Sequence, residues 1–337
     1  MPKTYHALMI TRPGGPEVLQ TLELPVVEPG PGELRVAVRA AGVGATDVIM
    51  LAGNYPFAPK IPFVPGYEIA GVVEALGAGV TGFRVGQRVA ALTVHGGFAE
   101  SLVRGAEHFV PIPDEVSDVE AVAVILNYVT AWQMMYRVAD IRAGQTALVT
   151  GAGGGMGTAL LQLLKLAGVK TYGAASPRKH GLVARLGATP VDYQLGPIDR
   201  QIRSYEPDGV DFVFDAIGGA NVGRCLRATR RGGMVVGYGF IAADSALAKA
   251  RMFWDLFVGS RLRGRRGKFY GITLRYRKDA KPFHEDLPKI FALVARRQIK
   301  PVVAAVFPLL EAKQAIELLA TGAVEGKIVL TCGEGRT

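Results

Sequence analysis

The glycine-rich turn around residue 154 has the clearest chemical meaning in this sequence. Five glycines occur within seven positions: Gly151, Gly153, Gly154, Gly155 and Gly157. They follow an apolar strand predicted at 147–150 and lead into an amphipathic helix predicted to reach Gly168. A helix N-terminus carries unpaired N–H groups and partial positive charge, and residues without side chains let a pyrophosphate approach the backbone. The turn therefore predicts a dinucleotide site contacted by Gly153, Gly154, Gly155 and Met156, with an ordinary glycine loop as the alternative.

The residues after the next predicted strand, 170–175, indicate which dinucleotide binds. An NAD site usually places an acidic residue there, bonded to the ribose 2'-hydroxyl. No acidic residue occurs between Gly151 and Val191, and the strand is followed instead by Ser176, Pro177, Arg178 and Lys179. One hydroxyl and two cations suit a 2'-phosphate, so NADPH is the predicted cofactor. Tyr193 is a further candidate donor to this phosphate. The alternatives are a solvated basic turn and a half-buried tyrosine at a strand end.

The elements that must position these residues fall into three segments. Residues 1–122 are predicted to be β-rich, with strands at 33–40 and 69–75. Residues 123–270 alternate strands and helices, as in a doubly wound parallel sheet; the strands are expected at 147–150, 170–175, 210–215 and 234–239. Residues 271–337 are expected to complete the first domain, with helices at 285–297 and 310–321 and strands at 302–307 and 326–331.

Composition narrows the class of protein. A length of 337 residues with 49% hydrophobic content suits two globular domains. The absence of a signal-like start and of any run of ~18 apolar residues predicts a cytoplasmic protein without a membrane span. Cys225 and Cys332 are too few for a disulfide framework or a zinc cluster. The net charge of +10 and the basic run 261–268 would suit binding to nucleic acid. The sequence contains no nucleic-acid-recognition motif, so no nucleic-acid partner is expected.

The order of these segments resembles that of medium-chain dehydrogenase/reductases over essentially the whole chain. The resemblance rests on the glycine turn and on three further segments: AGVGATD at 41–47, PGYEIAG at 65–71 and GFRVGQRV at 82–89. LNYVTA at 126–131 and the turn at 175–180 are most similar to the quinone oxidoreductase branch, in particular its vesicle amine transport protein relatives. The fold implied is α/β: a doubly wound parallel-sheet (Rossmann) domain at 123–270 plus a β-rich, partly open barrel (GroES-like) domain from 1–122 and 271–337.

The resemblance also implies a reaction. Zinc-dependent members hold their catalytic metal at positions that are Gly44, Tyr67 and Leu126 here, and none of these binds zinc, so no metal site is expected. Without a Lewis acid, alcohol oxidation loses its main electrostatic support. The zinc-free members reduce electron-poor double bonds. The expected activity is therefore hydride transfer from NADPH to a small-molecule quinone or α,β-unsaturated carbonyl.

Candidate catalytic residues come from the same resemblance. Related enoyl thioester reductases have a tyrosine at the position of Tyr55, which makes it the first candidate proton donor; an aromatic lid is the alternative. Asn127, also a catalytic candidate, and Thr130 are expected near the nicotinamide ribose and carboxamide, with helix capping as the alternative. The nicotinamide is expected to be flanked by three residues that otherwise pack a strand end: Tyr238, Gly239 and Phe240.

Other functions and a partner stay open at this point. Tyr67 is expected to fill the space of the missing metal ligand, and His95 in a glycine loop is a weak candidate for the pocket. An enoyl thioester reductase would use the basic run 261–268 to contact its substrate's phosphates. A non-enzymatic protein would use the NADPH fold as a ligand-gated interaction module. The segment 268–273 is predicted to be an apolar terminal strand, which favours a homodimer through that edge.

Overall fold

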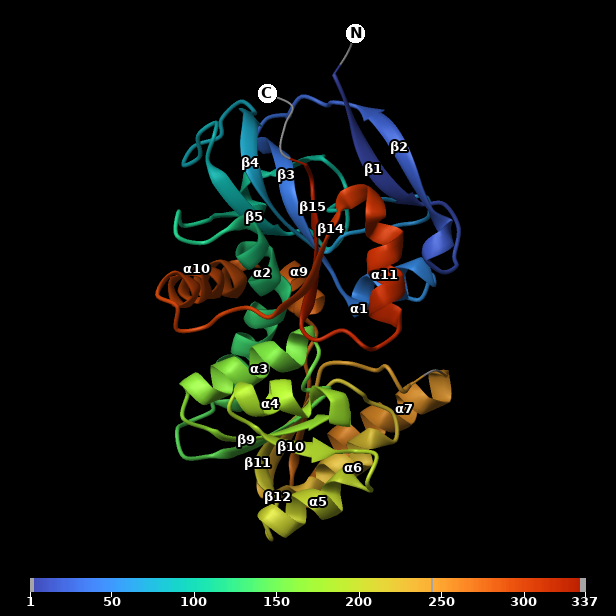
Figure 1. Cartoon of the computed structure of the whole chain (residues 1–337), viewed down its shortest axis with the longest axis vertical. Helices are drawn as coiled ribbons and strands as arrows, with labels where there is room; N and C mark the ends of the chain where they lie inside the picture. The colour runs from blue at the N-terminus through green and yellow to red at the C-terminus, as the bar shows by residue number, and fades with distance from the viewer. Residues whose placement is uncertain (1–2, 244, 334–337) are drawn as a thin grey trace. The chain divides into compact units, whose positions relative to one another are not determined.

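The computed structural model describes residues 3–243 and 245–333 (Figure 1). By its internal contacts the chain divides into two compact units. Unit 1 consists of Met1–Val129 and Tyr276–Thr337, and unit 2 is Thr130–Arg275. The sequence-based boundaries, after residues 122 and 270, stay a prediction beside these contact-based ones.

Unit 2 is built on a six-stranded parallel sheet. Its strands are β8 (Thr146–Thr150), β9 (Lys170–Ala175), β10 (Thr189–Asp192), β11 (Val210–Asp215), β12 (Thr229–Gly237) and β13 (Arg266–Phe269). They lie in the order β10-β9-β8-β11-β12-β13. This is the 3-2-1-4-5-6 order of dinucleotide-binding folds, in which ligands bind beyond the carboxyl ends of the strands where the order reverses. Here the reversal lies between β8 and β11.

Helices cover both faces of this sheet. They are η3 (Gln133–Ala139), α3 (Gly155–Leu166), η4 (Pro177–Lys179), α4 (His180–Arg185), α5 (Ile198–Tyr205) and α6 (Asn221–Ala228), followed by α7 (Ala246–Trp254), η5 (Asp255–Gly259) and α8 (Ser260–Leu262). Figure 1 shows α3 and α4 on one side of the strands and α5 and α6 on the other. Helix α3 buries Leu160 and Leu164 as the periodicity predicts, whereas Leu166 at its last turn is 44% exposed.

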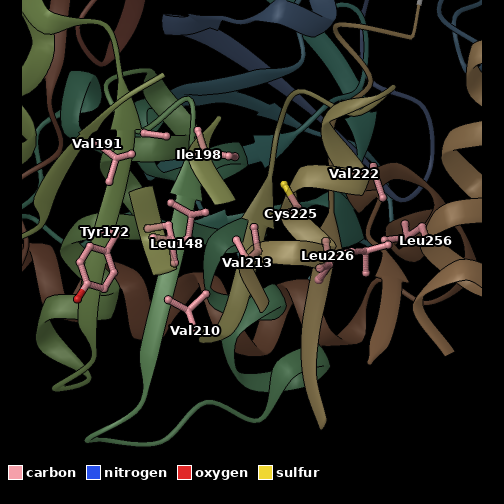
Figure 2. Close-up of a cluster of buried hydrophobic side chains, with 14 of the residues drawn as sticks. Leu148, Tyr172, Val191, Ile198, Val210, Val213, Val222, Cys225, Leu226 and Leu256 are labelled. Atoms are coloured by element: carbon pink, nitrogen blue, oxygen red, sulfur yellow. The ribbon is translucent and has the colours of Figure 1, made fainter. Parts of the chain in front are cut away.

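The core between sheet and helices is apolar and closely packed (Figure 2). Leu148 of β8, Tyr172 of β9 and Val213 of β11 belong to one buried cluster with Cys225 and Leu226 of α6. Cys225 is fully buried and acts as a small apolar side chain. Strands covered on both faces need nearly continuous apolar sequence, which is why their ranges were predictable. The sheet is a rigid base that presents its strand ends.

Unit 1 is β-rich. A two-stranded sheet pairs β1 (Thr4–Ile10) with β2 (Leu19–Pro25). A seven-stranded sheet contains β3 (Glu33–Val43), β4 (Glu68–Leu76), β5 (Arg88–Leu92), β6 (Ser101–Gly105), β7 (Phe109–Pro111), β14 (Val303–Pro308) and β15 (Lys327–Thr331). Its main order is β14-β15-β3-β4-β5-β7, with β6 paired to β3. In the described part of the chain this order does not close on itself, so the barrel is open. Strand β3 buries Leu34, Val36 and Val38 on alternate positions, as expected.

Helices complete unit 1. They are α1 (Ala45–Leu51), α2 (Asp118–Trp132), α9 (Ile272–Lys278), α10 (Lys281–Ala295) and α11 (Ala312–Ala320), with short 3-10 turns η1 (Pro16–Val18), η2 (Ala106–His108) and η6 (Leu309–Glu311). The unit boundaries fall within α2 and α9. The last strand, β15, lies beside β3, so a segment distant in sequence completes the sheet.

The predicted strand at 268–273 is wrong in its second half. Strand β13 ends at Phe269 and α9 begins at Ile272. Tyr270 between them is 2% exposed; its N–H donates to the Gly237 carbonyl over 2.8 Å, and its hydroxyl donates to Gln133 Oε1 over 2.5 Å. The apolar residues thus turn into unit 2 rather than extending an edge. A homodimer stays a prediction, with a shorter edge than expected.

Candidate functional site

The glycine turn leaves the N-terminus of α3 open to a ligand. Gly154 is the N-cap residue, and no side chain caps the helix. The N–H groups of the first helical turn have no partner within the helix and carry partial positive charge. Gly151 has a φ of +65°, and a Cβ on Gly157 would lie 2.3 Å from the Gly151 carbonyl oxygen. Glycine is strongly favoured at both positions, and the backbone here has the close-approach geometry expected of the predicted pyrophosphate loop.

Lys179 joins the glycine turn to the predicted phosphate site. It ends η4, directly after β9, and its side chain is buried at 8% exposure. A Cβ on Gly153 would lie 2.5 Å from Lys179 Cδ, so the aliphatic stem lies directly over that glycine. The missing side chain at Gly153 therefore admits the lysine stem, and this fixes a cation beside the loop.

The remaining predicted 2'-phosphate ligands gather at the ends of β9 and β10. Ser176 and Arg178 follow β9, and Arg178 is exposed. Asp192, the last residue of β10, is the register partner of Ala175, so the next residue, Tyr193, lies at the same sheet edge. Tyr193 is 52% exposed, so its ring can reach a ligand, and the half-buried packing alternative stays open. The structure brings a hydroxyl, two cations and a phenol to one edge.

The strand ends at the reversal point are tied together by Asp215. This residue ends β11, is fully buried and accepts hydrogen bonds from Thr150 Oγ1 of β8 over 2.8 Å and from the Gly218 N–H over 3.0 Å. Asn221 Nδ2 also donates to it over 2.8 Å. Asp215 therefore builds the turn after β11 and ties it to the end of β8.

Two predicted cofactor contacts carry buried polar atoms without a partner among the described residues: Thr130 Oγ1 and Tyr238 OH. Burial raises the pKa of Tyr238, so its hydroxyl stays protonated and is a donor in need of an acceptor. Such atoms are uncommon in folded proteins and suggest a bound partner. Asn127, 5% exposed, lies three residues before Thr130 on α2 and shares its helix face.

Gly239 and Phe240, the other two predicted cofactor contacts after β12, differ in their surroundings. A Cβ on Gly239 would lie 2.1 Å from the Ala216 carbonyl oxygen, so this position accepts only glycine. Phe240 packs against the apolar core of unit 2, and the Lys249 ammonium lies 5.5 Å from its ring centre. The geometry of Phe240 matches strand-end packing, which was its alternative interpretation.

In unit 1 the structure pairs two tyrosines that the sequence analysis treated separately. The hydroxyl oxygens of Tyr55 and Tyr67 are 2.7 Å apart. Tyr55 is half-buried, whereas Tyr67 is 2% exposed. Burial, followed by the neighbouring Tyr55, holds the pKa of Tyr67 well above its usual value. The Tyr67 hydroxyl therefore stays protonated and can donate a hydrogen bond to the Tyr55 oxygen. The pair has an outer, accessible phenol and an inner phenol that supports it.

Close to the tyrosines lie three buried ionisable side chains. Lys327 Nζ donates to Glu68 Oε1, and Glu68 Oε2 accepts from the Leu126 N–H over 2.6 Å. Glu68 is fully buried and Lys327 is 4% exposed. The pair crosses β3 at Gly42, where a Cβ would lie 2.2 Å from Glu68 Oε1. Asp47, 1% exposed, accepts from the N–H groups of Gly44 (2.8 Å) and Gly66 (3.3 Å), and burial raises its pKa to about 7.

The three positions that match metal ligands in zinc-dependent relatives are used in this hydrogen-bond network. Gly44 and Leu126 donate their N–H groups to Asp47 and Glu68, and the Tyr67 carbonyl accepts from the N–H groups of Thr93 and Val94. Over residues 3–243 and 245–333, no group of three or more His, Cys, Asp or Glu side chains is arranged to hold a metal.

The loop after β5 is strained. Val94 has a φ of +65° although it is β-branched and only 6% exposed. Such a conformation costs on the order of 1–3 kcal/mol. The loop is held by hydrogen bonds to the Tyr67 carbonyl from Thr93 N (2.9 Å) and Val94 N (3.1 Å), and Thr93 Oγ1 donates to the Gly66 carbonyl over 2.8 Å. The loop geometry is thus coupled to the position of Tyr67.

Sequence reasoning missed the buried ion pair. Its signal was present: Glu68 stands inside the apolar segment PGYEIAGVV, and Lys327 precedes the apolar run IVL. Charged residues in buried strands are usually paired. The residues that surround the strained loop, Arg104 and Arg277, carried no such signal because their positions depend on the fold.

Comparisons with known proteins agree with this architecture. A family model described as an alcohol dehydrogenase GroES-like domain matches residues 30–114, and one described as a zinc-binding dehydrogenase matches residues 186–330. The human synaptic vesicle membrane protein VAT-1 homolog-like is 30% identical over 96% of this chain and 80% of its own length. Rat quinone oxidoreductase is 29% identical over 97% of this chain and 98% of its own length.

A solved structure shows the same fold. Escherichia coli quinone oxidoreductase complexed with NADPH superposes with a TM-score of 0.87 at 25% identity, over 97% of this chain and 99% of that one. The predicted fold class and resemblance are therefore confirmed. No described helix is long and apolar enough to cross a membrane. The chain belongs to the medium-chain dehydrogenase/reductase family of oxidoreductases, in which VAT-1 homologues and quinone oxidoreductases are its relatives.

Proposed function

We propose that this protein is a zinc-independent, NADPH-dependent reductase of a quinone or an α,β-unsaturated carbonyl. The observation that carries the proposal is the buried Lys179 stem over Gly153, which places a cation between the glycine turn and the end of β9. Ser176, Arg178 and Lys179 would hold the 2'-phosphate, and the N-terminus of α3 the pyrophosphate. The orphaned Thr130 Oγ1 and Tyr238 OH fit a ligand rich in polar groups.

The chemistry divides between cofactor and protein. NADPH supplies the hydride. Tyr55 donates a proton to the oxygen of the reduced acceptor, and Tyr67 donates its hydrogen bond to the phenolate left at Tyr55, 2.7 Å away. Solvent returns the proton to Tyr55. Tyr67 is thus a positioning residue, and its raised pKa keeps it a donor throughout.

The test is oxidation of NADPH, and separately NADH, by metal-free protein with quinones, simple enones and enoyl-CoA thioesters. Lys179→Met keeps the stem packed on Gly153 and removes the charge. We expect a roughly 10–100-fold increase in KM for NADPH, the value of a charge-assisted hydrogen bond, with KM for NADH unchanged. Arg185→Met, at the end of α4, is the matched control. Equal use of both cofactors by the wild type would refute NADPH dependence.

A binding function without turnover is the second candidate, favoured by the 30% identity to the VAT-1 homolog-like protein. Tight NADPH binding without oxidation in the presence of any acceptor would support it. The thioester alternative stays open. Several guanidinium groups of the basic run 261–268 donate to nearby carbonyls, which orients them without neutralising their charge: Arg261 to that of Phe257, Arg263 to that of Gly259 and Arg265 to that of Thr229. Turnover restricted to enoyl-CoA thioesters would support it.

A further inference from the structure

A cavity in unit 1 has the chemistry of an anion site. Its volume is about 200 Å³, and its polar walls come from the strained loop after β5, from β6, from η2 and from α9. Those walls carry two arginines and two histidines: His95, Arg104, His108 and Arg277. None of the described lining residues is acidic. Four nitrogen-bearing side chains around so small a space favour a negatively charged occupant.

The two arginines are held by carbonyl groups rather than carboxylates. Arg104 Nη2 donates to the His95 carbonyl and Nη1 to the Val103 carbonyl, each over 3.3 Å. Arg277 Nη2 donates to the Phe57 carbonyl over 3.0 Å. In the part of the chain that the structure describes, no ion pair joins either arginine to an acidic side chain. Both guanidinium groups are fixed in place, and Glu33 attracts Arg104 at longer range without forming an ion pair.

The surroundings support this electrostatic picture. Burial, and then the charges of Arg104 and Arg277, lower the pKa of His95, so the imidazole stays neutral and can donate one hydrogen bond. His108 Nδ1 lies 3.0 Å from the Tyr276 hydroxyl, which orients the ring. The Glu107 carboxylate, 74% exposed, lies 3.6 Å from His108 Nε2.

The cavity adjoins the tyrosine pair. The Arg277 guanidinium lies 5.2 Å from the Phe57 ring centre, and Phe57 meets Tyr55 edge to face at 5.6 Å. On the other side, the strained loop that lines the cavity is held by two hydrogen bonds to the Tyr67 carbonyl. Strain of this kind clusters at ligand sites. The same residues therefore shape the cavity and position the proposed proton donor.

We infer that this cavity binds a carboxylate or phosphate group of the electron acceptor, so that the acceptor is an anionic enone or quinone. This deepens the proposed reductase function and rests on it. A cavity of about 200 Å³ is smaller than the roughly 300–1,000 Å³ that holds a whole drug-sized ligand. It suits one oxyanion on a short arm, with the reacting carbonyl left beside Tyr55.

The experiment compares matched acceptors with the full-length protein. The acceptors are an enone with a terminal carboxylate, its methyl ester and its phosphate analogue. We expect kcat/KM to favour the charged acceptors over the ester at least tenfold, and the better of the two identifies the anion. Arg277→Gln and Arg104→Gln should lower kcat/KM for the charged acceptors about 10–100-fold through KM and affect the ester much less. Lys278→Gln, exposed at the end of α9 and outside the cavity, is the control.

A binding measurement separates this inference from the reductase proposal. Calorimetry with inorganic phosphate and with acetate should show binding to the wild type and to Lys278→Gln that is lost in Arg104→Gln. If such binding occurs without turnover of any acceptor, the anion site stands and the reductase proposal fails. If charged and ester acceptors are reduced equally well and neither anion binds, the anion site is overturned while the reductase stands.

Discussion

The buried Glu68–Lys327 pair makes a strong prediction about stability. Lys327→Met keeps the length of the side chain and removes the charge, so the Glu68 carboxylate loses its cation in the interior of unit 1. Glu68 is fully buried, and Lys327 is 4% exposed. Removal of one partner from such a pair costs about 3–5 kcal/mol. Against a typical total of about 5–15 kcal/mol, that loss is large.

The double variant Glu68→Gln with Lys327→Met is the decisive comparison. It removes both charges, and the introduced amide keeps an oxygen for the Leu126 N–H, which donates to Glu68 over 2.6 Å. Replacing a buried pair by neutral groups of similar volume is often close to neutral in stability. We therefore expect the double variant to be more stable than either single variant, whereas independent effects would add.

The assay is amide hydrogen exchange, because the stability of unit 1 must be measured separately from that of unit 2. Amides of β3, β4 and β15 should lose protection in the single variants, and amides of β8 and α3 in unit 2 serve as the internal control. Both tryptophans, Trp132 and Trp254, belong to unit 2, so fluorescence alone would not report on the perturbed unit. Single variants that lose less than about 1 kcal/mol, or a double variant as unstable as the sum, would refute the reasoning.

Three further predictions follow from the same region. Folding raises the pKa of Asp47 from 3.8 to about 7, so between pH 3.8 and 7 the folded state binds this proton more tightly than the unfolded state. The free energy of unfolding therefore falls as pH rises through that range, by up to about 4 kcal/mol. In Asp47→Asn, the urea midpoint of unfolding should depend less on pH between about pH 4 and 8. Tyr55→Phe should lower kcat about 10²–10⁴-fold and Tyr67→Phe less, with KM for NADPH unchanged in both; equal losses would show that Tyr67 is more than a positioning residue. Gly42→Ala places a methyl group against the Glu68 carboxylate and should destabilise unit 1 by about 1–3 kcal/mol, visible as a lower Tm; an unchanged Tm would mean that Glu68 has room to move.

Local pattern was enough to predict much of unit 2. The predicted strands 170–175 and 210–215 coincide with β9 and β11, because both are short, mostly apolar segments bounded by turn residues. Tyr270 was misplaced because an apolar residue after a strand looks the same whether it extends the strand or turns into the core. Its buried hydrogen bond to Gln133, 137 positions away, decided the outcome.

The sequence predicted only those parts of the candidate site whose residues lie close together along the chain. The glycine turn and the residues that follow β9 lie close together in sequence, so their spacing carried the cofactor prediction. Other contacts join distant segments: Arg277 and Phe57 are 220 positions apart, and Lys327 and Glu68 are 259 apart. No spacing rule encodes such contacts, which exist only once the sheet order is set.

The position of β15 beside β3 has a consequence for biosynthesis. Unit 2 is one continuous segment and can fold as it leaves the ribosome, but the sheet of unit 1 lacks β14 and β15 until the segment that follows unit 2 has been made. At about 5–20 residues per second, the 259 residues between Glu68 and Lys327 take roughly 13–50 s to synthesise. Throughout that interval the nascent chain exposes an unpaired strand edge and a carboxylate without its lysine. Completion of the sheet of unit 1 therefore waits until β15 has been made, and chaperones have that interval in which to bind the open edge.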